Sequence, residues 1–556
     1  MRYIEKMDKN KIEITDFSFT YIEGKPILRG INLKIGRGFF GLIGPSGCGK
    51  STLCLALNGL IPHEIAGIKT GKVVVCGKDT EKFHPRQMAR HVGMVFQNPE
   101  SQLFSLCAED EIAFGPGNFG LSWNETEKMI DKILKLLNIE HLKDKSPEQM
   151  SSGERQKVAI ASALAIDPEI LVLDEPTANL DPKSAEEIFA ILKNISQTKT
   201  VFLAEHNVNQ VFRYCDYVAV MNGGTIAMQG STEDILRAKR FFDYIDLSEL
   251  AELGKALKVN KIPLIAEDLL GVIQIKKQKI ISGPRDGTKT RDEQKPIVET
   301  KNLDFAYDKN PVLRNINIKI YPQEFIAIVG NNGGGKSTLA LNLIGVLRPC
   351  KGKVLIDGKD IAKDKISKIT KMVGYAFQNP DLQIFEDTLL EEVAFGLKNI
   401  NFKDGLIQEK SNKVLRQAGL EIYAESDPFS LSLGQKRRLT IASILAMAPQ
   451  VILLDEPSTG IDNKNIESLM VPICDLNKSG RTIIMITHDM DLVARYAKRV
   501  VVLSGGRIIS DGPARKTFAQ SEVMEKANLV RPEINRLGHM LGNPEVLTAD
   551  DVLQLL

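Results

Sequence analysis

The segment Gly44-Pro-Ser-Gly-Cys-Gly-Lys-Ser51 decides the fold of this chain of 556 residues. It follows the apolar run Phe39-Phe-Gly-Leu-Ile43, which we interpret as a buried strand that ends at a glycine-rich turn. The order glycine, four residues, glycine, lysine and serine is typical of a phosphate-binding loop. In such a loop, backbone N–H groups and the positive N-terminal end of the next helix surround phosphate oxygens. We therefore predict a nucleotide-binding fold.

The same loop occurs again as Gly330-Asn-Asn-Gly-Gly-Gly-Lys-Ser337, after the apolar run Phe325-Ile-Ala-Ile-Val329. Other short segments recur with it, about 281 residues apart, such as Phe96-Gln-Asn-Pro99 with Phe377-Gln-Asn-Pro380. A nearly constant offset of this length indicates a duplicated domain and is far too long for a solenoid repeat. We place copy one at residues 10–275 and copy two at residues 297–556. The polar residues 276–296 between them contain glycine and proline, a composition typical of a flexible linker.

Short apolar runs alternate with helical segments in each copy, which predicts an α/β fold. The expected buried strands are 170–173 and 201–204 in copy one, with 451–454 and 482–486 in copy two. Continuous apolar runs between helices indicate a mostly parallel sheet that is covered on both faces.

Composition excludes several other classes of protein. The net charge is +2, from 72 basic and 70 acidic residues, so we expect no nucleic-acid partner. The seven cysteines are scattered, without the spacing of a disulfide framework, a zinc site or an iron–sulfur cluster, and we interpret them as reduced thiols. No run of about 18 apolar residues is present and the N-terminus has no apolar core, so we expect neither a membrane span nor a secretory signal.

An acidic pair follows the second buried strand of each copy: Asp174-Glu175 and Asp455-Glu456. An aspartate at this place in a phosphate-binding fold holds Mg²⁺, and the next carboxylate can orient the attacking water. Lys50 and Lys336 would contact the β- and γ-phosphates, while Ser51 and Ser337 would bind Mg²⁺.

With these motifs, both copies resemble nucleotide-binding domains of the ATP-binding-cassette (ABC) family over almost their whole length. The resemblance implies an ATPase that uses ATP and Mg²⁺. It also implies that each copy has a RecA-like sheet, an antiparallel β subdomain and a helical subdomain that carries the signature motif.

The resemblance assigns roles to further residues. Tyr21 and Tyr307 match the aromatic residue that stacks on adenine. Gln97 and Gln378 match the glutamine that senses Mg²⁺ and the γ-phosphate, and we add them to the expected metal ligands. His206 and His488 match the switch histidine, which we group with Glu175 and Glu456 as catalytic. Asp181 and Asp462 match an aspartate that packs across the dimer. The remaining expected nucleotide contacts are Gly44, Pro45, Ser46, Gly47, Cys48, Gly49, Thr52, Gly330, Asn331, Asn332, Gly333, Gly334, Gly335 and Thr338.

The signature motif of the family is altered in both copies, which read Met150-Ser-Ser-Gly-Glu154 and Leu431-Ser-Leu-Gly-Gln435. Ser151, Gly153, Ser432 and Gly434 are kept, so each motif can still present a hydroxyl, backbone N–H groups and a helix N-terminus to a phosphate. In the family, one domain's phosphate loop pairs with the other domain's signature. This implies an intramolecular head-to-tail pairing, and because Leu433 crowds one signature, we expect the site with Lys50 to be the weaker.

The segments after the two glutamines indicate a branch of the family. Gln97-Asn-Pro-Glu-Ser-Gln-Leu-Phe104 is matched by Gln378-Asn-Pro-Asp-Leu-Gln-Ile-Phe385, and both are followed by Glu-Ile/Val-Ala-Phe-Gly at 111–115 and 392–396. They resemble the energy-coupling-factor importers of vitamins, vitamin precursors, cobalt or nickel ions, whose ATPases end in tails similar to those at 249–270 and 536–553.

That resemblance implies a transmembrane coupling subunit, a separate membrane substrate-binding subunit and a location on the cytoplasmic face of the cell membrane. Two alternatives remain open. The chain could serve another importer class, for sugars or peptides. It could also be a soluble tandem ABC factor that acts on ribosomes or DNA, although it has no long charged helical linker and no cysteine cluster in its sequence.

Overall fold

The computed structural model describes residues 10–22, 24–178, 180–244, 248–273, 294–331, 333–459 and 463–556. The chain forms two compact units. The first contains residues up to Asp246 together with Asn260–Leu264, and the second contains Leu247–Val259 and Ile265–Leu556. The described residues 248–259 and 265–273, which the sequence analysis places in copy one, therefore pack within the second unit. Most of the predicted linker, 276–296, lies outside the described residues.

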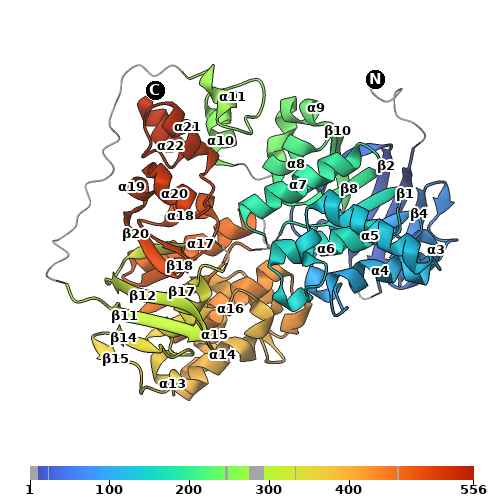
Figure 1. Cartoon of the computed structure of the whole chain (residues 1–556). Coiled ribbons are helices and arrows are strands. Elements are labelled where there is room, and N and C mark those ends of the chain that lie inside the picture. The colour runs from blue at the N-terminus through green and yellow to red at the C-terminus, as the bar shows by residue number, and fades with distance from the viewer. Residues whose placement is uncertain are drawn as a thin grey trace. The chain divides into compact units, whose positions relative to one another are not determined.

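The first unit contains two sheets (Figure 1). A four-stranded antiparallel sheet has the order β2-β1-β4-β5, and a six-stranded sheet has the order β10-β9-β3-β8-β7-β6. Strands β9, β3, β8, β7 and β6 are parallel, whereas β10 is antiparallel to β9. The bounds are β1 Ile12–Tyr21, β2 Pro26–Ile35, β3 Gly38–Ile43, β4 Gly67–Val75, β5 Lys78–Asp79, β6 Val92–Val95, β7 Ile170–Asp174, β8 Thr200–Glu205, β9 Tyr217–Asn222 and β10 Thr225–Ser231.

Helices of the first unit cover the six-stranded sheet and form a separate helical subdomain. Helices α4, α5 and α6 pack against one another, while α7 and α8 contact β3. The bounds are α1 Lys50–Leu57, α2 Leu60–His63, α3 Pro85–Met88, α4 Ala108–Asn118, α5 Trp123–Leu137, α6 Ser152–Leu164, α7 Pro182–Ser196, α8 Val208–Tyr214 and α9 Thr232–Arg237.

The second unit repeats this architecture. Its antiparallel sheet has the order β12-β11-β14-β15, and its mixed sheet has the order β16-β17-β18-β13-β19-β20, in which β20 is antiparallel to β19. The strand bounds are β11 Val298–Tyr307, β12 Asn310–Ile320, β13 Phe325–Val329, β14 Lys351–Ile356, β15 Lys359–Asp360, β16 Val373–Ala376, β17 Val451–Asp455, β18 Thr482–Ile486, β19 Arg499–Ser504 and β20 Arg507–Pro513.

The helices of the second unit include two that come from the end of copy one. The bounds are α10 Glu249–Ala256, α11 Glu267–Leu270, α12 Lys336–Leu343, α13 Ile366–Ile369, α14 Leu389–Asn399, α15 Asp404–Gln417, α16 Leu433–Met447, α17 Asn463–Lys478, α18 Met490–Tyr496, α19 Ala514–Ala519, α20 Ser521–Lys526, α21 Glu533–Met540 and α22 Ala549–Leu555.

Burial explains why the sequence forms these sheets. Every residue of β7, β13, β17 and β18 is buried, as expected for parallel strands that helices cover on both faces. By contrast, β12 alternates between buried and exposed residues, the pattern of an antiparallel strand with one face to solvent. The predicted α/β fold, with a mostly parallel sheet and an antiparallel sheet in each copy, is confirmed.

The ends of the two sequence copies pack against each other inside the second unit. Figure 1 shows α10 and α11 beside α21 and α22, and their apolar residues, among them Leu253 and Leu537, form one buried cluster. The polar contacts are reciprocal. Glu249 of α10 accepts a hydrogen bond from Ala549 N of α22 at 2.9 Å, and Glu533 of α21 accepts one from Ala266 N at 2.8 Å. Each copy therefore supplies the carboxylate that satisfies a backbone donor of the other copy.

We expect Glu249→Ala to speed amide hydrogen exchange at the start of α22, and Glu533→Ala to speed it near Ala266. Loss of an acceptor at a helix N-terminus costs about 1 kcal/mol, which is roughly fivefold in local opening. Hydrogen exchange followed by mass spectrometry measures both effects. Glu522→Ala, on the exposed face of α20, is the control and should leave both segments unchanged. Equal exchange in all variants would show that these contacts contribute nothing.

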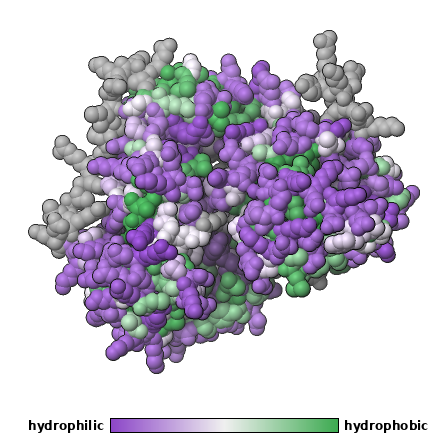
Figure 2. Space-filling view, viewed as in Figure 1, coloured by the Kyte–Doolittle hydropathy of each residue, from purple (hydrophilic) through white to green (hydrophobic). Residues whose placement is uncertain are grey.

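No helix among the described residues is long and apolar enough to cross a membrane. Figure 2 shows a face that is largely hydrophilic, with hydrophobic residues gathered in separate patches.

Candidate nucleotide-binding sites

The phosphate loop of copy one connects β3 to α1. Gly47 has φ 75° and Gly49 has φ 105°, values that favour glycine. A Cβ added at Gly47 would meet nothing within 4 Å, so this stretch of backbone borders open space. Lys50 begins α1, and its Nζ donates hydrogen bonds to Gly44 O at 3.0 Å and Pro45 O at 3.4 Å. The lysine thus ties its ammonium group to the first two residues of the loop.

The loop of copy two, between β13 and α12, has the same conformation. Gly333 has φ 75° and Gly335 has φ 95°. Lys336 Nζ donates to Gly330 O at 2.9 Å and to Asn331 O at 3.1 Å. Asn332, which the sequence also assigned to this loop, lies outside the described residues.

Glu175 lies at the centre of a buried polar cluster in copy one. Its Oε1 is 2.7 Å from His206 Nε2 and 3.6 Å from Lys50 Nζ, while its Oε2 accepts a hydrogen bond from Gln97 Nε2 at 2.8 Å. Burial acts to raise the pKa of Glu175, but the hydrogen bond and charge of His206, with the charge of Lys50, outweigh it and lower the pKa. The carboxylate is therefore ionised, the form that accepts a hydrogen bond from water.

Glu456 has a corresponding environment in copy two. Its Oε2 is 2.8 Å from His488 Nδ1 and accepts a hydrogen bond from Thr487 Oγ1 at 3.1 Å. Burial acts to raise its pKa, but His488 outweighs this and lowers it. Glu175 and Glu456 both have positive φ, 47° and 48°. A non-glycine residue in this left-handed region stores backbone strain, which is common at functional sites.

The residues predicted to bind Mg²⁺ fit such an ion. Asp174 ends β7 and Asp455 ends β17, and one oxygen of each (Oδ1) is buried without a hydrogen-bond partner among the described residues. Burial raises the pKa of Asp174 to about 6, although a hydrogen bond with Ser51 holds it down. The pKa of Asp455 is raised by burial too, against hydrogen bonds with Tyr375 and Ser337. A serine hydroxyl and a desolvated carboxylate together are a suitable oxygen set for this ion.

The predicted adenine-stacking tyrosines are partly exposed at the ends of β1 and β11. The Tyr21 hydroxyl lies 3.1 Å from Thr52 Oγ1, which places this ring beside the phosphate loop. Tyr307 packs edge-on against Phe305, as Tyr21 packs against Phe19.

The signature serines cap helices in both copies. Ser151 precedes α6 and Ser432 precedes α16, and each hydroxyl accepts a hydrogen bond from the backbone N–H three residues later. Both serines are exposed, whereas Gly153 and Gly434 are buried. Asp181 caps α7 in a similar way. Asp462, its predicted counterpart, lies outside the described residues.

Three site residues escaped the sequence analysis. In copy two, Tyr375 donates a hydrogen bond to Asp455 Oδ2 at 2.8 Å, and the buried Arg437 donates to the carbonyl oxygens of Glu456, Gln378 and Thr459. In copy one, the buried Glu205 accepts a hydrogen bond from Thr177 N at 3.3 Å. The other copy has Met94, Gln156 and Thr487 at the equivalent positions. A residue-by-residue comparison of the two copies shows these differences and could have indicated the three residues.

We expect Tyr375→Phe to weaken divalent-metal binding at the copy-two site by about tenfold, because a partner that orients a metal-binding carboxylate typically contributes that much. Titration of phosphate release with Mn²⁺ measures the change. Met94→Leu, at the equivalent position of copy one, provides the matched control. An unaltered Mn²⁺ dependence in Tyr375→Phe would mean that the hydrogen bond to Asp455 does not orient a metal ligand.

Comparison with known proteins accounts for this duplicated arrangement. A family model described as ABC transporter matches residues 28–178 and again residues 313–459. The chain belongs to the ABC transporter family.

Two relatives of similar length support the same assignment. A protein of Methanosarcina mazei, whose provisional name is ABC transporter ATP-binding protein, is 38% identical over 98% of this chain and 97% of its own length. A protein of Caldanaerobacter subterraneus with the same kind of name is 38% identical over 96% of this chain and 97% of its own length. A solved structure of cbiO1 from Clostridium perfringens, part of the ABC transporter complex cbiONQ, is 36% identical and covers 45% of this chain and 100% of that chain, with a TM-score of 0.39.

Members of the ABC transporter family bind ATP and hydrolyse it to drive transport, and this chain is therefore an ATPase of that kind. The two family matches each contain one phosphate loop and one Asp-Glu pair, so both copies carry the matched ABC region.

Proposed function

We propose that this chain energises a membrane importer of the energy-coupling-factor type, which takes up vitamins, vitamin precursors, or cobalt or nickel ions. The observation that carries this proposal is a pair of exposed phenylalanines at the same place in each copy. Phe104 is 66% exposed and contacts Phe114 edge-on, with ring centroids 4.8 Å apart. Phe385 is 56% exposed and contacts Phe395 in the same way at 4.5 Å.

A buried carboxylate holds each phenylalanine loop in place. Glu111 Oε2 accepts hydrogen bonds from Phe104 N at 3.0 Å and Ser105 N at 2.9 Å. Glu392 Oε2 does the same for Phe385 N at 3.0 Å and Glu386 N at 3.1 Å. A buried acid that orders a loop with an exposed aromatic at its tip supports a binding surface, since a core aromatic would point inward. The apolar surface fits helices of a transmembrane coupling subunit.

Within each nucleotide site we propose the following roles. Lys50 and Lys336 bind the β- and γ-phosphates, and Ser51, Asp174, Gln97 and their copy-two counterparts hold Mg²⁺. Glu175 and Glu456 orient the attacking water, while His206 and His488 contact the γ-phosphate. Gln97, His206 and Lys50 all contact Glu175 in this structure, so the roles proposed for them require these groups to exchange partners when nucleotide binds.

We further propose that the two ABC domains pair head to tail within one chain, so that Ser432 completes the site of Lys50 and Ser151 completes that of Lys336. The reciprocal packing of the two tails supports this pairing, because it links the end of copy one to copy two without a second chain. The assembly would lie on the cytoplasmic face of the cell membrane, with a separate membrane protein that binds the transported substrate.

Purification of the tagged chain from detergent-solubilised membranes of its own source tests this function. The proposal expects two integral membrane proteins without ABC domains, one of them small. Recovery of a single pair of membrane subunits together with a soluble sugar- or peptide-binding protein would favour the other importer class. Recovery of ribosomes or DNA would favour the soluble factor.

A further inference from the structure

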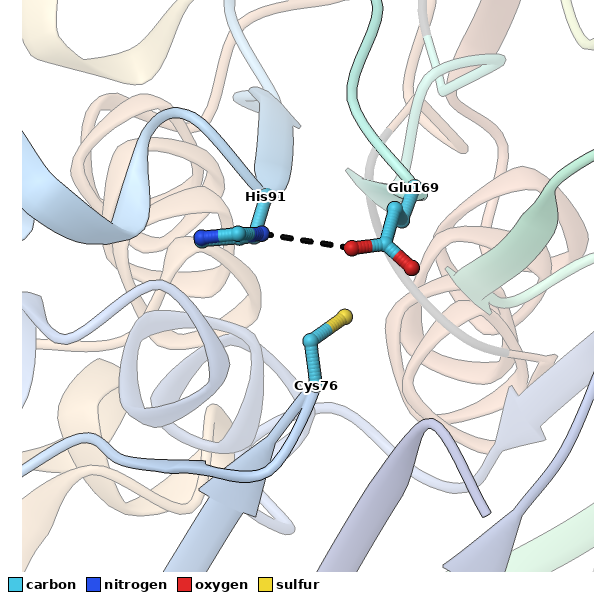
Figure 3. A group of neighbouring side chains, drawn as sticks. All are labelled: Cys76, His91 and Glu169. Carbon is cyan, nitrogen blue, oxygen red and sulfur yellow. Dashed lines mark hydrogen bonds and ion pairs between the residues drawn. The ribbon is translucent and has the colours of Figure 1, made fainter. Parts of the chain in front are cut away.

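Three side chains with metal-binding atoms meet in the first unit, far from the nucleotide site. Figure 3 shows Cys76, His91 and Glu169 directed toward one another, and one ligand atom from each lies within 4.8 Å of the others. Glu169 immediately precedes β7 and Asp174 ends it, so about five residues of strand, roughly 16 Å, separate the cluster from the predicted Mg²⁺ ligand.

The backbone around the cluster is fixed by hydrogen bonds. Cys76, in the turn between β4 and β5, donates from its N–H to Lys11 O at 2.7 Å. Ile170 N donates to His91 O at 3.0 Å, which holds the chain segments of His91 and Glu169 side by side. His91 Nδ1 lies 3.3 Å from Glu169 Oε1. The three residues thus come from three separate segments that the fold itself places together.

We propose that Cys76, His91 and Glu169 bind a divalent transition-metal ion of the Zn²⁺ class, with water as the fourth ligand. Sulfur, imidazole nitrogen and carboxylate oxygen together are the ligands that Zn²⁺ takes in proteins. Three protein ligands leave one position open, and the partial exposure of the His91 and Glu169 side chains, 27% and 44%, gives an ion access from solvent.

Copy two has the same backbone without the same ligands. Asp357 N donates to Ile297 O at 2.8 Å and Val451 N donates to Met372 O at 2.9 Å, which repeats both hydrogen bonds of copy one. The positions of Cys76, His91 and Glu169 are occupied there by Asp357, Met372 and Gln450. Because the fold of the domain forms with either set of residues, the Cys-His-Glu set is not needed for the backbone conformation.

Two features of the cluster oppose the binding of a metal ion. Lys11 Nζ forms an ion pair with Glu169 Oε2 at 2.5 Å, so an incoming ion must displace an ammonium group. Burial, with the nearby charge of Glu169, raises the pKa of the Cys76 thiol to about 11 despite Lys11 and Lys78, so binding also displaces a proton.

The test uses the purified full chain, stripped of metal with a chelator and titrated with Co²⁺ in the absence of ATP. We expect a thiolate-to-cobalt charge-transfer absorption that reaches its maximum at one ion per chain and is abolished by added Zn²⁺. Cys76→Ser should remove the absorption. His91→Met and Glu169→Gln, which introduce the copy-two residues, should weaken binding at least about tenfold, since even partners outside the ligand set contribute that much. Cys350→Ser, an exposed cysteine of copy two, is the matched control and should change nothing.

The variant Lys11→Met distinguishes a metal site from a polar network that binds no ion. Removal of the competing ammonium should tighten Co²⁺ binding severalfold in a chain whose melting temperature stays close to that of the wild type. If the wild type gives no charge-transfer absorption, or if the absorption survives Cys76→Ser, the proposal is wrong. If binding is unaffected by Lys11→Met and by His91→Met in folded protein, the ion is bound elsewhere and the proposal is equally wrong.

Discussion

Replacement of Glu175 and Glu456 together by glutamine is expected to abolish steady-state phosphate release and to leave ATP binding intact. Both carboxylates are buried, ionised and close to a histidine, and they follow the strand that carries the predicted Mg²⁺ ligand. A glutamine amide has nearly the same shape but is a much weaker proton acceptor. Because general base catalysis contributes about 10²–10⁴-fold, the double variant should lose at least about 100-fold in rate.

The control for this experiment is Glu187→Gln, on the exposed side of α7, where the carboxylate pairs with Lys157 at 2.7 Å. It should retain the wild-type rate. Bound ATP is measured separately by filter binding, so that a loss of rate is not mistaken for a loss of substrate. Near-normal phosphate release from the double variant would show that neither glutamate acts on the water.

Replacement of Phe104 and Phe385 together by alanine is expected to separate the chain from the proposed transmembrane coupling subunit while ATP hydrolysis by the chain continues. A central aromatic at an interface contributes about 2 kcal/mol or more, which is roughly 30-fold in affinity for each ring. The rings are exposed in the chain, so their truncation opens no cavity in the core. Co-purification with the transmembrane subunit and ATPase rate are the two measurements.

Ile422→Ala is a suitable control, because Ile422 is exposed but lies outside the two phenylalanine loops. A second double variant carries Glu111→Gln and Glu392→Gln. Loss of the buried charges should loosen both phenylalanine loops without removing a ring. If the double alanine variant is folded and still co-purifies at the wild-type level, the phenylalanine loops are not the docking surface, and the proposed energy-coupling-factor function loses its main support.

The core of each domain was predictable because the relevant patterns are local. The runs at 325–329 and 482–486 were expected as buried strands and are β13 and β18 with the same bounds. The phosphate loop depends on glycines at fixed spacing before a helix, so eight residues were sufficient to place Lys50 and Lys336. The Asp-Glu pairs could be placed for the same reason, since each follows an uninterrupted apolar strand.

Features that depend on contacts between distant segments were not predictable. Cys76, His91 and Glu169 have no regular spacing, so the cysteine pattern gave no indication that these three side chains meet. The packing of α10 and α11 with the second unit involves residues almost 300 positions apart, and the apolar pattern of a tail does not specify its partner. Tyr375 was missed because an aromatic residue in a short strand is usually a packing residue.

The number of ATP molecules bound to the Glu175→Gln, Glu456→Gln chain tests most directly whether this single chain contains two working nucleotide sites. Equilibrium binding of labelled ATP with Mg²⁺ should give two per chain, with the weaker of the two lost when Lys50→Ala is added and the other lost with Lys336→Ala. If the chain binds only one ATP, and still binds one after either lysine substitution, it does not contain two working sites.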